Sequence, residues 1–177
     1  MKKINLNQLK RGISGVTTAF GEFLWETLVY CLMKMGHKSG VHLIVSGNKK
    51  EKFEVTWSGK LNKEVATTYN DELDLAEYAA TAMAILLVLK LTDYTHLKRA
   101  QKGTKGDYWL GRKDSNGILV LDGLLEISGI LQENKHNRLS KRFKEKEIQV
   151  KLSPYKSVAK NIIVVEFSTP KAKVQVK

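Results

Sequence analysis

The sequence predicts a mixed α/β fold, of the α+β or α/β class, in which a mixed central sheet is flanked by helices. Long helical patterns and separate strand-like runs occur along the chain, and no low-complexity segment interrupts them. The chain has 177 residues, of which 42% are hydrophobic and 27% charged, so it can bury the core of a single domain covering residues 1–177. We therefore expect one ordinary globular unit rather than a disordered chain.

The N-terminal part of the chain predicts a helix followed by a hairpin. Residues 1–14 show no clear pattern, and we expect a loosely held arm. Apolar residues recur every three or four positions between residues 15 and 36, and the glycine at the end of this pattern is suited to terminate a helix. Residues 41–46 and 53–57 then predict two strands joined by a turn, and residues 59–69 predict a polar connection.

A second helix is expected to be the buried centre of the domain. Asn70 or Asp71 can cap it, and residues 75–91 are apolar on nearly every side. Glu77 is the lone acid among these apolar neighbours. It could be a carboxylate of a functional site, or it could stabilise the helix dipole from near the first turn, and the sequence supports both interpretations.

The second half of the chain continues with three strands, a helix and a last strand. A Gly-rich basic loop separates the first two strands, and a turn at residues 113–117 follows the second. The helix is basic, with Leu139 and Phe143 facing inward and Ile148 as a further candidate for its apolar side. The last strand is a nearly continuous apolar run, typical of the middle of a covered sheet, and we expect a basic tail over residues 170–177 after it. The predicted elements are the strands at residues 94–100, 107–111 and 124–131, the helix at 134–150 and the strand at 162–167.

The net charge of +12 is concentrated in the last quarter of the chain. Between residues 134 and 177 lie twelve Lys and Arg side chains and only three acids. A basic face of this kind attracts polyanions such as nucleic acid. A lysine-rich surface that only keeps the protein in solution has the same composition, so charge alone leaves both interpretations open.

Several classes of site and compartment are not supported. Cys31 is the only cysteine, which excludes an intramolecular disulfide and a cysteine zinc site, and the four histidines lack metal-ligand spacing. The basic N-terminus is not followed by an apolar segment, and the longest apolar run is too short to cross a bilayer. We expect a cytoplasmic protein with no membrane association.

Asp107 and Glu126 form the pattern that looks most like a functional site. Asp107 opens one strand, and Glu126 lies within the next strand along the chain. Adjacent strands can bring two such carboxylates together over Mg²⁺, a hard ion that takes oxygen ligands, beside a phosphate. The structural alternative is that Asp107 caps a turn after Gly106 and that Glu126 is a strand acid satisfied by its neighbours.

The order of the elements and the placement of these acids resemble the PD-(D/E)XK nuclease superfamily, which has the restriction-endonuclease-like fold. The resemblance covers residues 71–169 and implies an αβββαβ core, to which residues 1–70 add a helix and a hairpin. It also implies a metal-dependent nuclease in which Asp107, Glu126 and the backbone carbonyl of Ile127 bind Mg²⁺.

The family's lysine, two residues after the second acid, is replaced here by Ser128. A serine cannot supply the positive charge that orients the attacking water. Basic residues of a flanking strand or of the basic helix could supply it, and we expect Lys98 and Lys141 to be catalytic, with Arg138 and Arg142 as further candidates. The residues expected to bind nucleic acid are Lys102, Lys105, Arg138, Lys141, Arg142 and Lys144.

Two further patterns bear on function. The chain is similar to small uncharacterised bacterial proteins that share three short stretches, here residues 107–111, 125–130 and 164–170, and this similarity implies no particular activity. Tyr108 and Trp109 point to opposite faces of their strand, so one should be core, and the other could stack on a base or pack at the rim of the core.

Three functions fit these patterns. The first is a metal-dependent nuclease, acting alone or as a subunit of a larger system, in which Asp107, Glu126 and a cation converge in one cleft. The second is a catalytically inactive protein of the same fold that binds nucleic acid or a protein partner through its basic C-terminal quarter. The third is a structural subunit whose helix at residues 15–36 packs on a protein partner or on a second copy of the chain.

Overall fold

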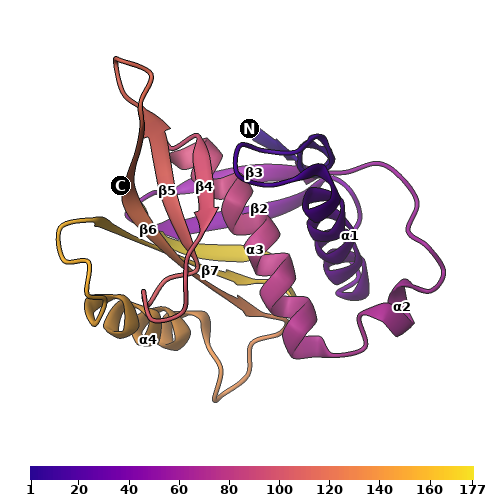
Figure 1. The fold of residues 1–177 in the computed structure, drawn as a ribbon. Coiled ribbons are helices and arrows are strands. Elements are labelled where there is room, and N and C mark those ends of the chain that lie inside the picture. The colour runs from indigo at the N-terminus through magenta and orange to yellow at the C-terminus, as the bar shows by residue number, and fades with distance from the viewer.

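One mixed sheet of eight strands runs through the protein (Figure 1), which is described over residues 1–177 by a computed structural model. The strand order is β1-β3-β2-β8-β7-β6-β5-β4. The prediction of a mixed α/β fold is therefore confirmed. The strands are β1 (Lys2–Asn5), β2 (Val41–Gly47), β3 (Glu51–Thr56), β4 (His96–Arg99), β5 (Tyr108–Lys113), β6 (Leu119–Ile130), β7 (Ala159–Glu166) and β8 (Lys171–Gln175).

Helices cover both faces of this sheet (Figure 1). The helices α1 (Thr18–Lys34) and α3 (Glu72–Leu91) pack together on one face, and α4 (Leu139–Lys151) packs on the other. Alternate residues of β7 contribute to two separate apolar clusters, since Ile163 and Val165 belong to the large core under α3 whereas Ile162 and Val164 pack with α4. The remaining helices are the 3-10 helix η1 (Leu6–Arg11) and α2 (Val65–Thr68), and no helix is long and apolar enough to span a membrane.

The helix α3 is the buried centre of the domain, as the sequence predicts. Asp71 caps its N-terminus, where the side chain accepts hydrogen bonds from the backbone N–H groups of Leu73 and Asp74. The helix approaches β6 so closely that a Cβ atom at Gly129 would lie 2.0 Å from the carbonyl oxygen of Ala76. Glycine is required at this position because any side chain would push the first turns of α3 away from the sheet.

The four strands β4, β5, β6 and β7 lie side by side in chain order. The pairs β4–β5 and β5–β6 are antiparallel, and β6 and β7 are parallel neighbours joined through α4. A helix, three strands, a helix and a strand thus follow one another between Glu72 and Glu166. The β5–β6 pairing brings the start of β5, which Asp107 precedes, next to the part of β6 that contains Glu126.

The two ends of the chain differ from their predictions. The expected arm at residues 1–14 contains β1 and η1, and Ile4, Leu6 and Leu9 are fully buried. The expected basic tail at residues 170–177 contains β8, which lies between β2 and β7 in the middle of the sheet. Both predictions were wrong because the strands are short and rich in lysine. In β8, half-buried lysines alternate with buried Ala172 and Val174, and in β1 only Ile4 is buried.

The basic helix is also shorter than predicted. It begins at Leu139 rather than at residue 134, because the Oε1 atom of Glu133 accepts a hydrogen bond of 2.6 Å from the backbone N–H of Leu139. Asn134 forms a turn before it, accepting hydrogen bonds from the N–H groups of His136 and Asn137. The segment predicted to be one helix is therefore a turn followed by a helix. Ile148 does not face inward but is exposed, because Val150 continues the buried side of α4.

Candidate functional site

The two predicted acids lie beside each other where the start of β5 pairs with the middle of β6. The backbone N–H of Asp107 donates to the carbonyl of Leu125 at 2.7 Å, one residue beyond the paired positions Tyr108 and Leu125. The Oδ2 atom of Asp107 accepts a 2.9 Å hydrogen bond from the N–H of Ile127. Asp107 and Glu126 line one open cavity of about 360 Å³ together with side chains of α4. The antiparallel register thus brings together two acids that are nineteen residues apart in sequence.

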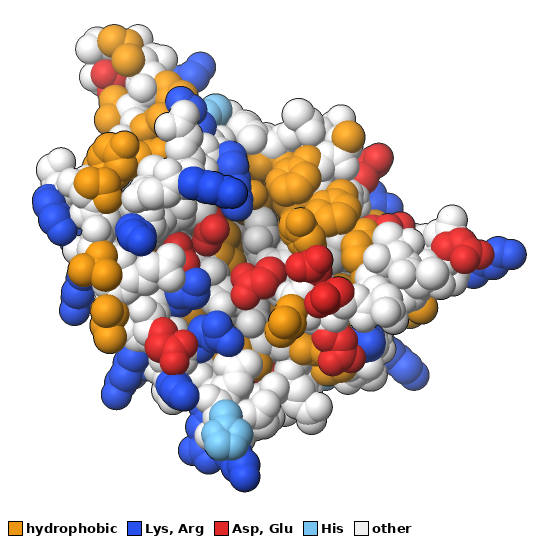
Figure 2. Space-filling view, turned by 60° about the horizontal axis from the view of Figure 1, so that its bottom comes forward, with side chains coloured by type: hydrophobic (Ala, Val, Ile, Leu, Met, Phe, Trp, Pro, Cys, Tyr) orange, Lys and Arg blue, Asp and Glu red, His pale blue; other side chains and the backbone are white.

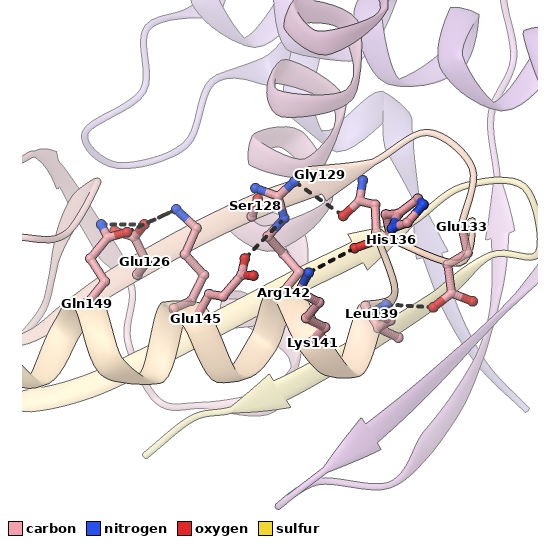
Figure 3. Close-up of polar contacts among 12 residues, drawn as sticks. Glu126, Ser128, Gly129, Glu133, His136, Leu139, Lys141, Arg142, Glu145 and Gln149 are labelled. Atoms are coloured by element: carbon pink, nitrogen blue, oxygen red, sulfur yellow. Dashed lines mark hydrogen bonds and ion pairs between the residues drawn. The ribbon is translucent and has the colours of Figure 1, made fainter.

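Glu126 is buried, and α4 supplies its polar partners. Only 3% of the residue is exposed, and its Oε1 atom accepts hydrogen bonds from Lys146 Nζ at 2.6 Å and from Gln149 Nε2 at 2.8 Å. Figure 3 shows Glu126 on β6 facing Gln149 across the gap between strand and helix. Burial, and next the negative charge of Asp107, raise the pKa of Glu126 to about 7, although the contacts with Lys146 and Gln149 act in the opposite direction.

A third carboxylate, that of Glu77, reaches the same strand from α3. Its Oε1 atom lies 3.2 Å from Ser128 Oγ and 3.4 Å from the N–H of Gly129, both of which donate to it. Glu77 is open to solvent on one side, yet partial burial of its carboxyl group raises its pKa. The hydrogen bonds from Gly129 and Ser128 lower this pKa, and the negative charge of Asp107 adds to the increase. Desolvation is the largest of these effects. Ser128 therefore binds a carboxylate and adds no positive charge beside Glu126.

Each of the three carboxylates keeps one oxygen that accepts no hydrogen bond from the protein. For Glu126 and Glu77 this is Oε2, because both donors of each residue bind Oε1. For Asp107 it is Oδ1, whose nearest cation is Arg99 Nη1 at 3.8 Å. As the side chains stand, no three of them are close enough to hold a metal ion. The donors are all oxygen atoms, which is the type that Mg²⁺ takes, but the three carboxylates would have to move closer together to share one ion.

The Gly-rich basic loop before β5 has a defined shape at the rim of this cavity. Thr104 is buried, and its Oγ1 atom lies 3.0 Å from the carbonyls of both Gln101 and Gly106. A Cβ atom at Gly106 would lie 2.5 Å from the Leu124 side chain, so the loop can approach β6 only with glycine there. The loop presents Lys102 and Lys105 at the edge of the cavity that contains Asp107 and Glu126.

Asp107 lies between two cavities. On one side is the cavity with Glu126 and Lys146, and on the other is a cleft of about 550 Å³ between α1, α3 and β5. Glu77, Arg99 and Asp107 are among the residues that line this second cleft. Figure 2 shows acidic side chains gathered near the middle of one face of the molecule, with basic and hydrophobic side chains around them.

The predicted cationic residues are not the ones that the structure places at Glu126. Lys98 is exposed on β4 and lines neither of the two cavities. Lys141 lies in the first turn of α4, and its ammonium donates to the carbonyl of His136 in the preceding turn. The Arg142 side chain bonds Asn137 and is 3.9 Å from Glu145, as Figure 3 shows. The prediction that Lys98 and Lys141 supply the charge beside the acids is therefore corrected to Lys146.

The predicted nucleic-acid-binding residues fall into three groups. Lys102 and Lys105 line the cavity that contains Asp107 and Glu126. Lys141 and Arg142 line a separate polar cavity of about 510 Å³ at the N-terminus of α4. The remaining two residues, Arg138 and Lys144, are exposed. Arg138 directly precedes α4, and Lys144 lies on the outer side of this helix.

Lys146 was missed, although the sequence contains a signal for it. Leu139, Phe143 and Val150 are the buried residues of α4, and position 146 continues their spacing of three and four residues. Lys146 is thus a lysine on the apolar side of an amphipathic helix, where it needs a buried partner. The same signal, a charged residue among apolar helix positions, marks Glu77 on α3, which the sequence already indicated as a possible site carboxylate.

The paired aromatic residues of β5 have different environments. Tyr108 is buried, with 3% of its surface exposed, and belongs to the core under α3. Trp109 is half-buried and packs edge-on against Tyr155, with ring centroids 4.8 Å apart. The prediction that one of the two is core is confirmed, and the other packs at the rim.

Comparisons with protein-family models, with curated proteins and with solved structures found no significant match for this chain.

Proposed function

We propose that this protein is a metal-dependent nuclease with a restriction-endonuclease-like core. The observation that carries the proposal is the convergence of Asp107, Glu126 and the ammonium of Lys146 at one cavity. Two acids on neighbouring strands and a nearby cation are the groups that such chemistry needs. The order of elements from α3 to β7 and the pairing of β4 to β7 support the same core.

Each residue has a role in this proposal. Asp107, Glu126 and the carbonyl of Ile127 would hold Mg²⁺, which when bound polarises a phosphoryl oxygen and lowers the pKa of a coordinated water. Lys146 takes the role of the family's lysine, since its ammonium lies 2.6 Å from Glu126 and can hold a water or the negative charge on a phosphate oxygen. Lys102 and Lys105 attract the nucleic-acid backbone to the rim.

The assay for this proposal measures cleavage of single- and double-stranded DNA and RNA with Mg²⁺ or Mn²⁺. Asp107→Asn, Glu126→Gln and Lys146→Met should each lower the rate by roughly a hundredfold or more, because each change removes charge from the reacting centre. Asp122→Asn and Lys151→Met are the matched controls, since Asp122 pairs with Arg112 away from the cavity and Lys151 is exposed on the same helix as Lys146. These two should leave cleavage within a factor of two or so.

A catalytically inactive nucleic-acid-binding module of the same fold is the second candidate. It is favoured by the fact that Glu126 already has two protein partners, as a purely structural strand acid would. This function predicts no cleavage with either metal and binding that weakens steeply as salt rises. Cleavage that survives Asp107→Asn and Glu126→Gln unchanged would contradict the nuclease proposal.

A further inference from the structure

We propose that the cleft between α1, α3 and β5 binds one unpaired nucleobase, so that the substrate of this protein is single-stranded or frayed nucleic acid. The inference rests on the proposed nuclease function and adds the substrate class to it. The cleft has a volume of about 550 Å³, and its apolar lining includes Phe20, Tyr78 and Tyr108. Asp107 lines both this cleft and the cavity of Glu126, so the two spaces meet at one carboxylate.

The aromatic side chains of the cleft are held by one another. The Phe20 and Phe23 rings are stacked, with centroids 5.9 Å apart and planes 17° apart. The Phe23 ring meets Tyr78 edge-on, with centroids 4.9 Å apart and planes 81° apart. Tyr78 nevertheless remains 42% exposed, which is unusual for a ring held on a buried helix. A fixed, exposed aromatic ring can stack on any base without a large entropic cost.

The polar groups of the cleft favour a base over a bare phosphate. Asp74, Glu77 and Asp107 line the cleft and present oxygen acceptors, which repel an anion but can accept hydrogen bonds from the amino and imino groups of a base. Arg99 is the one cation in the lining, and its guanidinium lies 4.9 Å from the centroid of the Tyr108 ring and 3.8 Å from Asp107 Oδ1. Arg99 therefore stands between the two spaces, where the phosphate of a bound nucleotide would pass.

Base-paired nucleic acid does not fit this arrangement. Inside a duplex both faces of each base are covered by its neighbours, so a base can enter a cleft only after it has left the stack. A single strand offers exposed faces at no such cost, because aromatic stacking is tolerant of sequence. A strand that places one phosphate at Arg99 can direct the adjacent base toward Tyr78, since both residues line the same cleft.

The test measures binding separately from cleavage. The probe is a DNA oligonucleotide that carries one 2-aminopurine, as a single strand or annealed to its complement, added to the Glu126→Gln protein in EDTA. The single strand should bind at least about tenfold more tightly than the duplex, and 2-aminopurine fluorescence should fall as the base stacks. In the same background, Tyr78→Ala should weaken single-strand binding about tenfold and abolish the fluorescence change, whereas Tyr78→Trp should preserve both.

Leu73→Ala is the matched control, because Leu73 is an exposed apolar residue of the same helix that does not line the cleft. Unchanged thermal unfolding of each variant ensures that the comparison reports binding. Equal affinity for the two forms of DNA, or single-strand binding that is unaffected by Tyr78→Ala, would overturn the inference even if Mg²⁺-dependent cleavage is observed. Stacking without any cleavage would instead overturn the nuclease proposal and preserve the base-binding cleft.

Discussion

The ammonium of Lys146 lies 2.6 Å from the Oε1 atom of Glu126, in a pair whose side chains are 19% and 4% exposed. The two residues belong to α4 and β6, and Gln149 shares the same carboxylate oxygen. A buried pair of this kind has a large desolvation cost, so it contributes less to stability than its short distance suggests. Loss of one partner, however, leaves the other charge without compensation inside the protein.

Removal of the lysine should therefore destabilise the folded state in a pH-dependent manner. We expect Lys146→Met to lower the free energy of unfolding by about 2–3 kcal/mol at pH 8, where the Glu126 carboxylate would be left ionised beside Gln149 alone. The loss should be smaller at pH 5, because the carboxyl group can then take up a proton. Urea denaturation at the two pH values measures both quantities. Lys144→Met, an exposed change on the same helix, should stay within about 0.5 kcal/mol of the native protein.

The raised pKa of Glu126 predicts a specific pH profile for stability. The folded state holds this proton more tightly than the unfolded state, since the pKa rises from 4.5 to about 7 on folding. The associated stabilisation is complete below about pH 4.5 and is lost as pH rises through 7, with a total of about 3 kcal/mol. The difference in unfolding free energy between the native protein and Glu126→Gln should fall by that amount over this interval and stay constant at higher pH. Urea denaturation in a chelator provides the two curves, and parallel curves would contradict the assignment.

The close approach of α3 to β6 predicts that Gly129 cannot be replaced. A Cβ atom there would lie 2.0 Å from the carbonyl oxygen of Ala76, and backbone rather than a flexible side chain would have to move. We expect Gly129→Ala to cost about 2–3 kcal/mol of unfolding free energy and to displace the Glu77 carboxylate from Ser128. Chemical denaturation measures the cost, with Ser140→Ala on the exposed side of α4 as the control. A stability equal to that of the native protein would show that the helix does not lie this close.

The position of β8 in the middle of the sheet predicts that the last seven residues are essential for folding. This strand pairs with β2 on one side and β7 on the other, and its Ala172 and Val174 are fully buried. Removal of residues 171–177 should abolish cooperative thermal unfolding, because it divides the sheet and exposes two strand edges. Circular dichroism of the truncated chain tests this, and removal of the exposed Lys177 alone should preserve the transition.

Much of the local structure could be predicted because it depends on short-range periodicity. The cap at Asp71, the all-round apolar α3 and the apolar run of β7 are properties of neighbouring residues, and each was read from the sequence at nearly its observed place. Short strands in which lysines alternate with apolar residues were not recognised. In β8, Lys171 and Lys173 flank buried Ala172, and a pattern of five residues is too short to separate from a charged tail.

The sequence by itself determined the class of the fold, the buried central helix and the presence of an acid near the start of β5 and another within β6, because these follow from the order and period of residue types. Only the tertiary structure decided which other side chains reach those acids. Lys146 and Glu77 come from helices on opposite faces of the sheet, and Tyr78 meets Phe23 through the packing of α3 on α1. Contacts between distant segments depend on the strand register and on how each helix packs, and neither property is contained in the local pattern of the chain.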